Sequence, residues 1–345
     1  MALGAALACS AVAMTPESCA GCHAKESKAH EASLMAQTLQ VGGASPILRA
    51  NPELTLRAGG YFYRIYRKGD RSFYSVTDGT RTLDLPILWG VGQGSRGQTF
   101  ILEMGGRLYE SWVSYYGALH GLALTVGVPP DRVVNSLEEA AGRPVSAKAL
   151  EECFACHSAA PAHTANLPNG TKEWAEARLP GVRCESCHAG AARHEDALRR
   201  GDAGAAKIAS LKGMGAEDMS ELCGRCHRTW ADIELDGPRG IGNVKFQAYR
   251  IVKSKCYDTA DPRISCTACH DPHDRSGPVA RAVTDAACRN CHNPGARLER
   301  PPRICKVSQD NCVSCHMPQY EMPGAHHKFT DHYIRIAKAG EPYPD

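Results

Sequence analysis

The sequence is poor in the side chains that build an ordinary hydrophobic core. Only 6% of its 345 residues are aromatic, while 33 are Gly and 21 are Pro. After the first residues no apolar run approaches the 18 or so residues of a membrane span, so we expect no transmembrane segment in the mature chain. The formal net charge of +3 gives no reason to expect a nucleic-acid partner. A charged fraction of 22% also argues against a disordered chain.

Cysteine, by contrast, is abundant, and most of it follows one pattern. Fourteen of the 17 Cys fall into seven C-x-x-C-H motifs, far more than an intracellular enzyme normally carries. The motifs pair Cys19 with Cys22, Cys153 with Cys156, Cys184 with Cys187, Cys223 with Cys226, Cys266 with Cys269, Cys288 with Cys291 and Cys312 with Cys315.

The spacing of the motif suits covalent attachment of haem. Two thiols three residues apart can add to two vinyl groups at one edge of a porphyrin, and the imidazole that follows is then held under the iron. Zinc, the rival, needs four ligands and has no reason to require a His after every pair. With so little chain for each haem, the haems themselves should form the core. We therefore expect seven covalently bound c-type haems (haem c, iron), with proximal ligands His23, His157, His188, His227, His270, His292 and His316.

Eight further histidines nearly match in number the seven second axial ligands that seven irons need, and we expect about five or six of them to be ligands. His273 follows His270 too closely to reach the other face of the same haem, so it should ligate a neighbouring one. Met35, on an expected helix over residues 24–40, is either a core side chain or the distal ligand of the first haem. The distal candidates are Met35, His120, His163, His194, His273, His326, His327 and His332.

The N-terminus indicates export. Residues 1–13 form a short apolar run ending in Ala11-Val12-Ala13, which is typical of a signal-peptidase site, although no Lys or Arg precedes it. We therefore expect an exported protein that is periplasmic, membrane-associated or extracellular. An oxidising compartment permits a disulfide, and we predict one between Cys256 and Cys305, the alternative being two buried free thiols.

Residues 42–130 differ from the rest of the chain. They contain no Cys, and 12 of the 22 aromatic residues lie between positions 61 and 116. Residues 61–66 and 72–77, and again 98–103 and 107–112, flank turn signals that predict two hairpins. Gly92–Gly97 matches G-x-G-x-x-G, but a strand pattern follows where a dinucleotide site needs a helix, so we expect the glycines either to form a turn or to let the backbone contact the first haem.

The expected fold is a mainly α or irregular multihaem cytochrome fold with little regular secondary structure, plus a small antiparallel β-rich insertion. The expected organisation is a signal peptide (1–13), a first haem segment (14–41), the β-rich insertion (42–130) and a multihaem domain (131–345).

Several of these motifs resemble those of bacterial multihaem c-type cytochromes of the cytochrome c-552/c-554-like superfamily, the group often fused to TPR repeats. The resemblance implies that Met35, His194, His273 and His332 are ligands, and it supports roles for Cys256 and Cys305. The chain departs from the pattern at Ser95-Arg96, where the family often has a His, and no TPR array follows residue 345. The shared elements are Cys19–His23 with Met35, Gly92–Gly97, Leu179–His188 with His194, Ser254–Cys256, Ile264–His273, and Asn311–Pro318 with Phe329–His332.

Electron transfer is the function that this pattern favours. The near-match of distal ligands to irons predicts closely packed, mostly bis-His haems, with other cytochromes or a quinol-linked membrane complex as redox partners. The alternative is an oxidoreductase acting on a small nitrogen or sulfur compound at one five-coordinate haem. No C-x-x-C-K motif marks such a haem, so the sequence favours a carrier and leaves the catalytic residues of any enzyme unknown.

Overall fold

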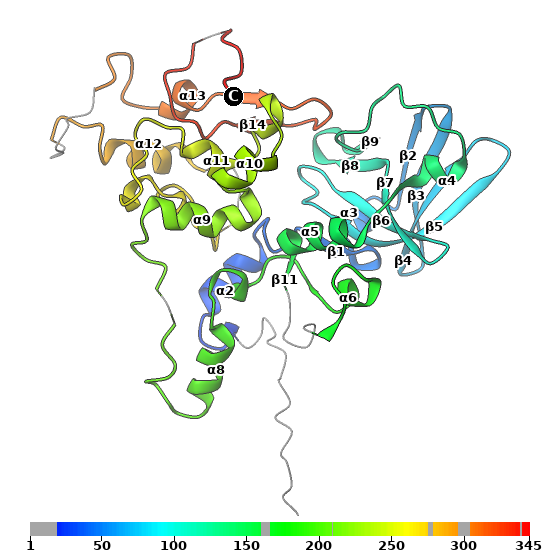
Figure 1. Ribbon diagram of the computed structural model, residues 1–345, viewed down its shortest axis with the longest axis horizontal. Coiled ribbons are helices and arrows are strands. Elements are labelled where there is room, and N and C mark those ends of the chain that lie inside the picture. Colours follow the sequence, from blue (N-terminus) through cyan, green and yellow to red (C-terminus); the bar gives the residue numbers. More distant parts are fainter. Residues whose placement is uncertain (1–18, 160–165, 209, 275–278, 296–303, 339) are drawn as a thin grey trace, which may run out of the picture.

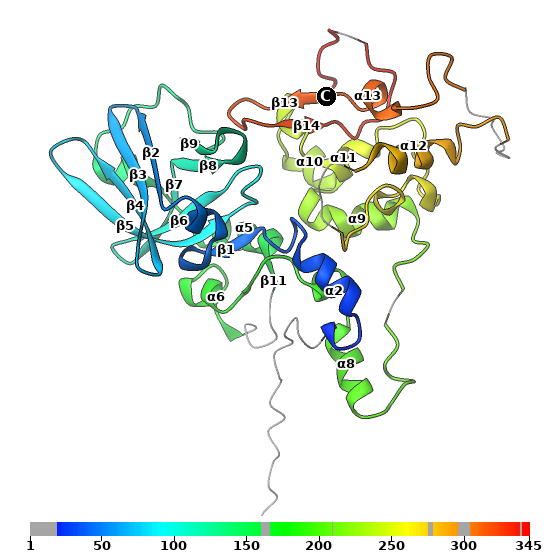
Figure 2. The same cartoon turned by 180° about the vertical axis from the view of Figure 1, so that it is seen from behind.

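The computed structural model describes residues 19–159, 166–208, 210–274, 279–295, 304–338 and 340–345. An antiparallel β-sheet formed mainly by the N-terminal half lies beside a group of short helices formed by the C-terminal half (Figures 1 and 2). The expected signal peptide and His163 lie outside the described residues. Within them, no helix is long and apolar enough to cross a membrane.

The main sheet has eight strands in the order β10-β7-β6-β5-β4-β3-β2, with β1 also paired to β5, and it curls into a half-barrel. Both predicted hairpins are confirmed, because β3 pairs with β4 and β6 pairs with β7. The strands are β1 Leu39–Val41, β2 Glu53–Ala58, β3 Tyr61–Lys68, β4 Arg71–Thr77, β5 Thr82–Val91, β6 Thr99–Met104, β7 Arg107–Ser111 and β10 Gly142–Pro144, with β8 Val113–Tyr116 and β9 Gly121–Leu124 as a separate hairpin.

The curl of the sheet comes from strand β5, which changes partners along its length. Its first half pairs with β4 as far as Pro86, and its second half pairs with β6 on one side and β1 on the other. A register shift between Ile87 and Trp89 marks the change, and such irregularities increase strand twist. Proline, which has no N–H to donate, is tolerated here because it lies where pairing to β6 has not yet begun.

The expected fold class is wrong in its proportions. The structure contains 34% helix and 22% strand, and its β part is a large half-barrel, not a small insertion. Only the two hairpins have clear turn signals in the sequence. Pro86 interrupts the strand pattern of β5, and the short strands β1 and β10 join the sheet from outside residues 42–130, so the sequence did not predict these three strands.

Helices in the structure are short and form mostly outside the sheet. Several begin at a residue whose side chain caps the first turn, such as Ser146 before α5 and Thr229 before α10. The α-helices are α2 Ala24–Glu31, α3 Pro46–Ala50, α4 Leu137–Ala141, α5 Ala147–His157, α6 Lys172–Glu176, α7 Cys184–Cys187, α8 Ala191–Arg199, α9 Ala216–His227, α10 Trp230–Asp236, α11 Gln247–Ile251, α12 Arg281–Arg289 and α13 Cys312–His316.

Short 3-10 helices and two small hairpins complete the described elements. The 3-10 helices are η1 Gly42–Ala44, η2 Gly117–Leu119, η4 Gly240–Asn243, η5 Pro262–Ile264 and η6 Cys266–Ala268, and the hairpins pair β11 Ser158–Ala159 with β12 Leu179–Pro180 and β13 Gln319–Glu321 with β14 Lys328–Thr330. The helix expected over residues 24–40 is α2 alone, which ends at Glu31. The Gly92–Gly97 segment is a turn followed by β6, as predicted.

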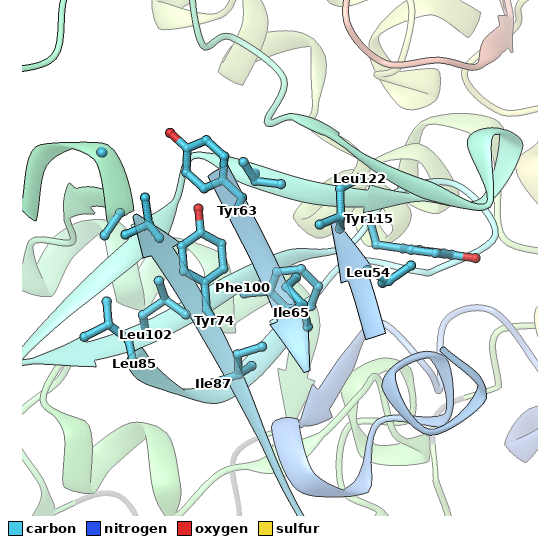
Figure 3. Packing of buried hydrophobic residues seen from close by; sticks show 14 of the residues in the cluster. Leu54, Tyr63, Ile65, Tyr74, Leu85, Ile87, Phe100, Leu102, Tyr115 and Leu122 are labelled. Carbon is cyan, nitrogen blue, oxygen red and sulfur yellow. The ribbon is translucent and has the colours of Figure 1, made fainter. Parts of the chain in front are cut away.

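Two hydrophobic clusters pack against opposite faces of the sheet. On β6, Phe100 and Leu102 point into the first cluster, which fills the inside of the half-barrel (Figure 3). Ile101, between them, points the other way into the second cluster with Trp89 and Phe154, as the two-residue period of a strand requires. Since Phe154 lies on α5, the second cluster fixes that helix to the sheet.

The C-terminal half has no comparable core among its described residues. Both clusters draw their members from positions 39–175. Beyond them, many of the buried apolar side chains are alanines, with a few larger ones such as Tyr249 and Ile233. This half therefore depends on something other than apolar side chains to hold its helices together, as expected if haems form the core.

The disulfide predicted between Cys256 and Cys305 stays a prediction. Both side chains are exposed in the structure. Pairing requires close Cα atoms as well as an oxidising environment.

We expect Phe100→Ala to lower the free energy of unfolding of the sheet by about 3–5 kcal/mol, because it removes a fully buried ring from a closely packed cluster. Chemical unfolding followed by far-UV circular dichroism would measure the change. The matched control is Val133→Ala, because Val133 is 79% exposed. Equal stability of the two variants would contradict the packing described above.

Cys305 should react with iodoacetamide faster than Cys256 at neutral pH. Backbone N–H groups of Ser308 and Val307 lower the pKa of Cys305, whereas desolvation by neighbouring protein atoms raises the pKa of Cys256, and the thiolate is the reactive form. Peptide mass spectrometry over a time course would give both rates, with Cys256→Ser as the control. If neither residue is labelled until a reductant is added, the two are joined after all.

Candidate functional site

The backbone of the C-x-x-C-H motifs forms about one helical turn. In the first, third, fifth and sixth motifs the His N–H donates to the carbonyl of the first Cys, at 2.8–3.0 Å. Residues three apart on a helical turn lie on one side, so the two thiols face the same way with the imidazole next to them. This is the arrangement needed for two thioether bonds and one axial ligand.

The motifs lie next to one another although they are far apart in sequence. Cysteines of different motifs lie close enough to shift one another's pKa, as do Cys19 and Cys184, Cys156 and Cys226, Cys223 and Cys266, and Cys288 and Cys312, and the elements that carry these motifs contact one another in the pairs α5 with α9, α9 with η6 and α12 with α13. Electrostatic interactions also link Cys187 to Cys223 and Cys269 to Cys288. The motifs therefore follow one another in the spatial order first, third, fourth, fifth, sixth and seventh, and the second joins at the fourth.

Three motif histidines face a second histidine. The ring centroids of His23 and His194 are 6.5 Å apart, those of His188 and His273 are 6.1 Å apart, and those of His270 and His332 are 6.2 Å apart. Two imidazoles on opposite sides of one iron have centroids roughly 6 Å apart, because each metal–nitrogen bond is about 2.0 Å and each nitrogen lies about 1.1 Å from its ring centroid. The three pairs therefore fit an iron between their rings.

His273 lies beside the third motif although it follows the fifth motif in the chain. Its ring plane is only 4° from parallel with that of His188, at a centroid distance of 6.1 Å, while His270 of the fifth motif faces His332. One short segment thus contributes to two adjacent sites.

Hydrogen bonds fix the orientation of several of these imidazoles. The Nδ1 atoms of His157, His316 and His332 lie 2.9–3.1 Å from the carbonyl oxygens of Thr38, Arg335 and Thr330, and that of His194 contacts the carbonyl of Ala206. A carbonyl can only accept, so Nδ1 carries the proton and the lone pair of Nε2 is free for a metal.

Burial keeps these rings in the neutral form that a metal requires. It lowers the pKa of His157, His188, His227 and His270, and it lowers the pKa of His332 to about 4. Low polarity disfavours the imidazolium ion. At neutral pH these histidines are therefore available as ligands without first losing a proton.

A cavity of about 500 Å³ lies between the third motif and α9, within the range of sites that hold ligands and cofactors. Its lining is mixed, with apolar walls and an Arg, an Asp and a Glu, which suits a group that is apolar except for charged edge substituents. In the described residues, no three His, Cys, Asp or Glu side chains converge on one point. The cavity is lined by Cys187, Ala189, Leu211, Met214, Asp218, Glu221, Leu222, Arg225 and Thr229.

The other distal candidates have different surroundings. Tyr116 meets the ring of His326 edge-on, and Arg96 Nη1 lies 2.8 Å from the ring nitrogens of His327, while His120 is exposed. Met35 lies in the turns after α2, where its carbonyl accepts from Val182 N–H. Among the described residues no histidine ring stacks on His157, His227 or His316.

Two residues near these sites were not predicted from the sequence. Arg250 and Asp331 form a fully buried ion pair next to His332. Asp331 could have been noticed because it directly precedes a candidate ligand. Nothing in the sequence links it to Arg250, 81 positions away.

Comparisons with known proteins agree with this geometry. Residues 130–189, which contain the second and third motifs, match the family model described as cytochrome c554 and c-prime. Over 175 residues the chain is 25% identical to the dissimilatory sulfite reductase MccA of Wolinella succinogenes, an alignment covering 40% of this chain but only 22% of that protein. The crystal structure of the outer cell wall cytochrome OcwA superposes with a TM-score of 0.50 at 13% identity, covering 94% of this chain and 79% of that one, which supports likeness of fold alone.

Seven C-x-x-C-H motifs brought together in space, paired imidazoles at the separation of axial ligands, and similarity to cytochromes in both sequence and fold lead to one conclusion. The chain is a multihaem c-type cytochrome.

Proposed function

We propose that this cytochrome is a heptahaem electron carrier. Each motif would attach one haem through its two cysteines, and its histidine would be the proximal ligand. When bound, each haem supplies an iron that gains and loses one electron. The observation that carries the proposal is the contact between successive motifs, from Cys19 through Cys184 to Cys312, which leaves none of the seven isolated.

The protein chain would position the haems and enclose their iron atoms. Its one-turn motifs set the spacing, and its Nδ1–H to carbonyl bonds hold imidazoles at a fixed angle. His194, His273 and His332 would cap the far side of three sites and so keep water and small molecules off the iron. Closed sites favour a carrier over an enzyme because no position remains for a substrate.

The covalent sites can be counted directly. We expect seven haems per chain when the protein is produced with a c-type maturation system, measured from the pyridine haemochrome spectrum and the intact mass. Replacing both Cys184 and Cys187 by Ala should lower the count by one. Replacing Cys305 by Ser should leave the count unchanged, and a lower count in that variant would mean that attachment extends beyond the motifs.

His273→Ala should open one iron. Because His273 faces His188, we expect one haem per chain to change from low-spin to high-spin in the EPR spectrum of the oxidised protein and to bind carbon monoxide when reduced. Val133→Ala is the control, because Val133 is 79% exposed. A wild-type spectrum for the His273 variant would refute ligation by His273.

A second function deserves a test at the second motif. His157 faces no histidine ring in the described residues, and the aromatic side chains Trp89, Phe154 and Trp174 shelter this motif on one side. An open iron here would allow an oxidoreductase acting on a small nitrogen or sulfur compound. The similarity to a protein described as a dissimilatory sulfite reductase points the same way, over a small share of that protein.

EPR titration with sulfite, nitrite and hydroxylamine distinguishes these two functions. A carrier with every iron capped should show low-spin signals that none of them alters. An enzyme should show a high-spin ferric signal that one of them abolishes, and Cys153→Ala with Cys156→Ala should remove that signal.

The remaining expectations are part of this proposal. We propose export to the periplasm or cell exterior after removal of residues 1–13, redox partners among other cytochromes or a quinol-linked membrane complex, and the organisation 14–41, 42–130 and 131–345. The likeness of fold to an outer cell wall cytochrome is compatible with export.

A further inference from the structure

Arg250 and Asp331 form a fully buried ion pair in the C-terminal half. Neither side chain has exposed surface. Arg250 Nε lies 2.9 Å from one carboxylate oxygen of Asp331, and Nη2 lies 3.0 Å from the other. This two-pronged contact fixes the angle as well as the distance between the groups.

The remaining donors around this pair are also satisfied. Arg250 donates to Asn243 Oδ1 at 3.3 Å and to the carbonyl of Pro344 at 2.9 Å. Arg335 adds a second donor to Asp331 at 2.9 Å. Taking an ion pair out of water costs several kcal/mol per ion and is repaid only with good geometry and full hydrogen bonding. A fully buried ion pair is therefore weak evidence for a gain in folding stability, and we look for a different role for Arg250 and Asp331.

The residue that directly follows Asp331 is the candidate ligand His332. The carboxylate of Asp331 also accepts a hydrogen bond from the N–H of Tyr333 at 3.0 Å. The carboxylate that binds Arg250 therefore also fixes the backbone on the C-terminal side of His332. Ser254 completes the clamp, donating to the carbonyl of His332 at 3.3 Å and accepting from the N–H of Ile334 at 2.8 Å.

The imidazole itself is fixed by its own segment. His332 Nδ1–H donates to the carbonyl of Thr330 at 3.0 Å, which turns Nε2 away from that carbonyl, and the ring faces His270 at 6.2 Å. The segment 330–334 thus fixes the orientation of the imidazole. Hydrogen bonds from Arg250 and Ser254 in turn fix the position of this segment.

We propose that Arg250 is a positioning residue for His332, which keeps the iron of the fifth motif six-coordinate. The inference rests on the proposed ligation by His332. The guanidinium group is needed for its shape, since lysine carries the same charge but has a single nitrogen that cannot hold both carboxylate oxygens at fixed angles. An imidazole that loses these supporting contacts binds the metal less firmly, because its orientation depends on them.

Arg250→Lys tests this in the haem-loaded protein. We expect the EPR spectrum of the oxidised protein to lose the low-spin signal of one haem and gain a high-spin signal, with carbon monoxide binding at one haem on reduction. Added imidazole should restore the low-spin signal by replacing the displaced ring. Ser254→Ala should cause the same change to a smaller extent, and it decides the matter alone if the lysine variant does not fold.

The matched control is Arg64→Lys. Arg64 makes the same two-pronged contact with Glu53, at 3.1 Å and 3.1 Å, but on the exposed surface of the sheet. Its spectrum should equal that of the wild type. If Arg250→Lys and Ser254→Ala fold and have wild-type spectra, the inference is overturned, even if their thermal stability falls.

His332→Ala separates the inference from the proposal beneath it. If this variant keeps every low-spin signal, ligation by His332 fails, and the role of Arg250 fails with it. If His332→Ala opens one iron while the Arg250 and Ser254 variants open none, ligation stands and only the positioning role is wrong.

Discussion

The helical turn of the C-x-x-C-H motif is the constraint on which the cytochrome half depends. One hydrogen bond from the His N–H to the first Cys carbonyl closes the turn and puts two thiols and an imidazole on one side. Because the turn is local, it can form the end of an 11- or 12-residue helix, as in α5 and α9, or stand alone, as in α7 and α13. The helices therefore need no shared apolar face, and the described residues beyond position 175 form no large apolar cluster.

The half-barrel is organised by a different force. Its strands alternate apolar side chains between two faces, and hydrophobic burial on both faces makes it rigid. One face holds α5 through Phe154, so the second motif is anchored to the sheet and not only to other motifs. The loop between β13 and β14 contacts the β8–β9 hairpin through His326 on Tyr116, and it contacts the Gly92–Gly97 turn through His327 on Arg96. The β-rich part thus contacts the cytochrome half at two places, α5 and this loop.

Supporting contacts recur around the imidazoles. Backbone carbonyls accept from Nδ1 at His157, His194, His316 and His332, so the main chain sets the tautomer at four places. At His332 the backbone is itself held by a buried charge pair. Burying such a network costs folding free energy, but it fixes the orientation of the side chains, and a metal ligand requires a fixed orientation.

The sequence by itself determined the chemistry, because each C-x-x-C-H motif is local and its meaning lies in spacing alone. It also placed His273 beside a neighbouring motif, since so short a connection allows little else. Only the tertiary structure decided the size of the sheet, because β1 and β10 join it from distant residues and β5 changes partners at Pro86. It likewise decided the spatial order of the motifs and the contact of Arg250 with Asp331. Each of these depends on contacts between residues far apart in the chain, which no local pattern encodes.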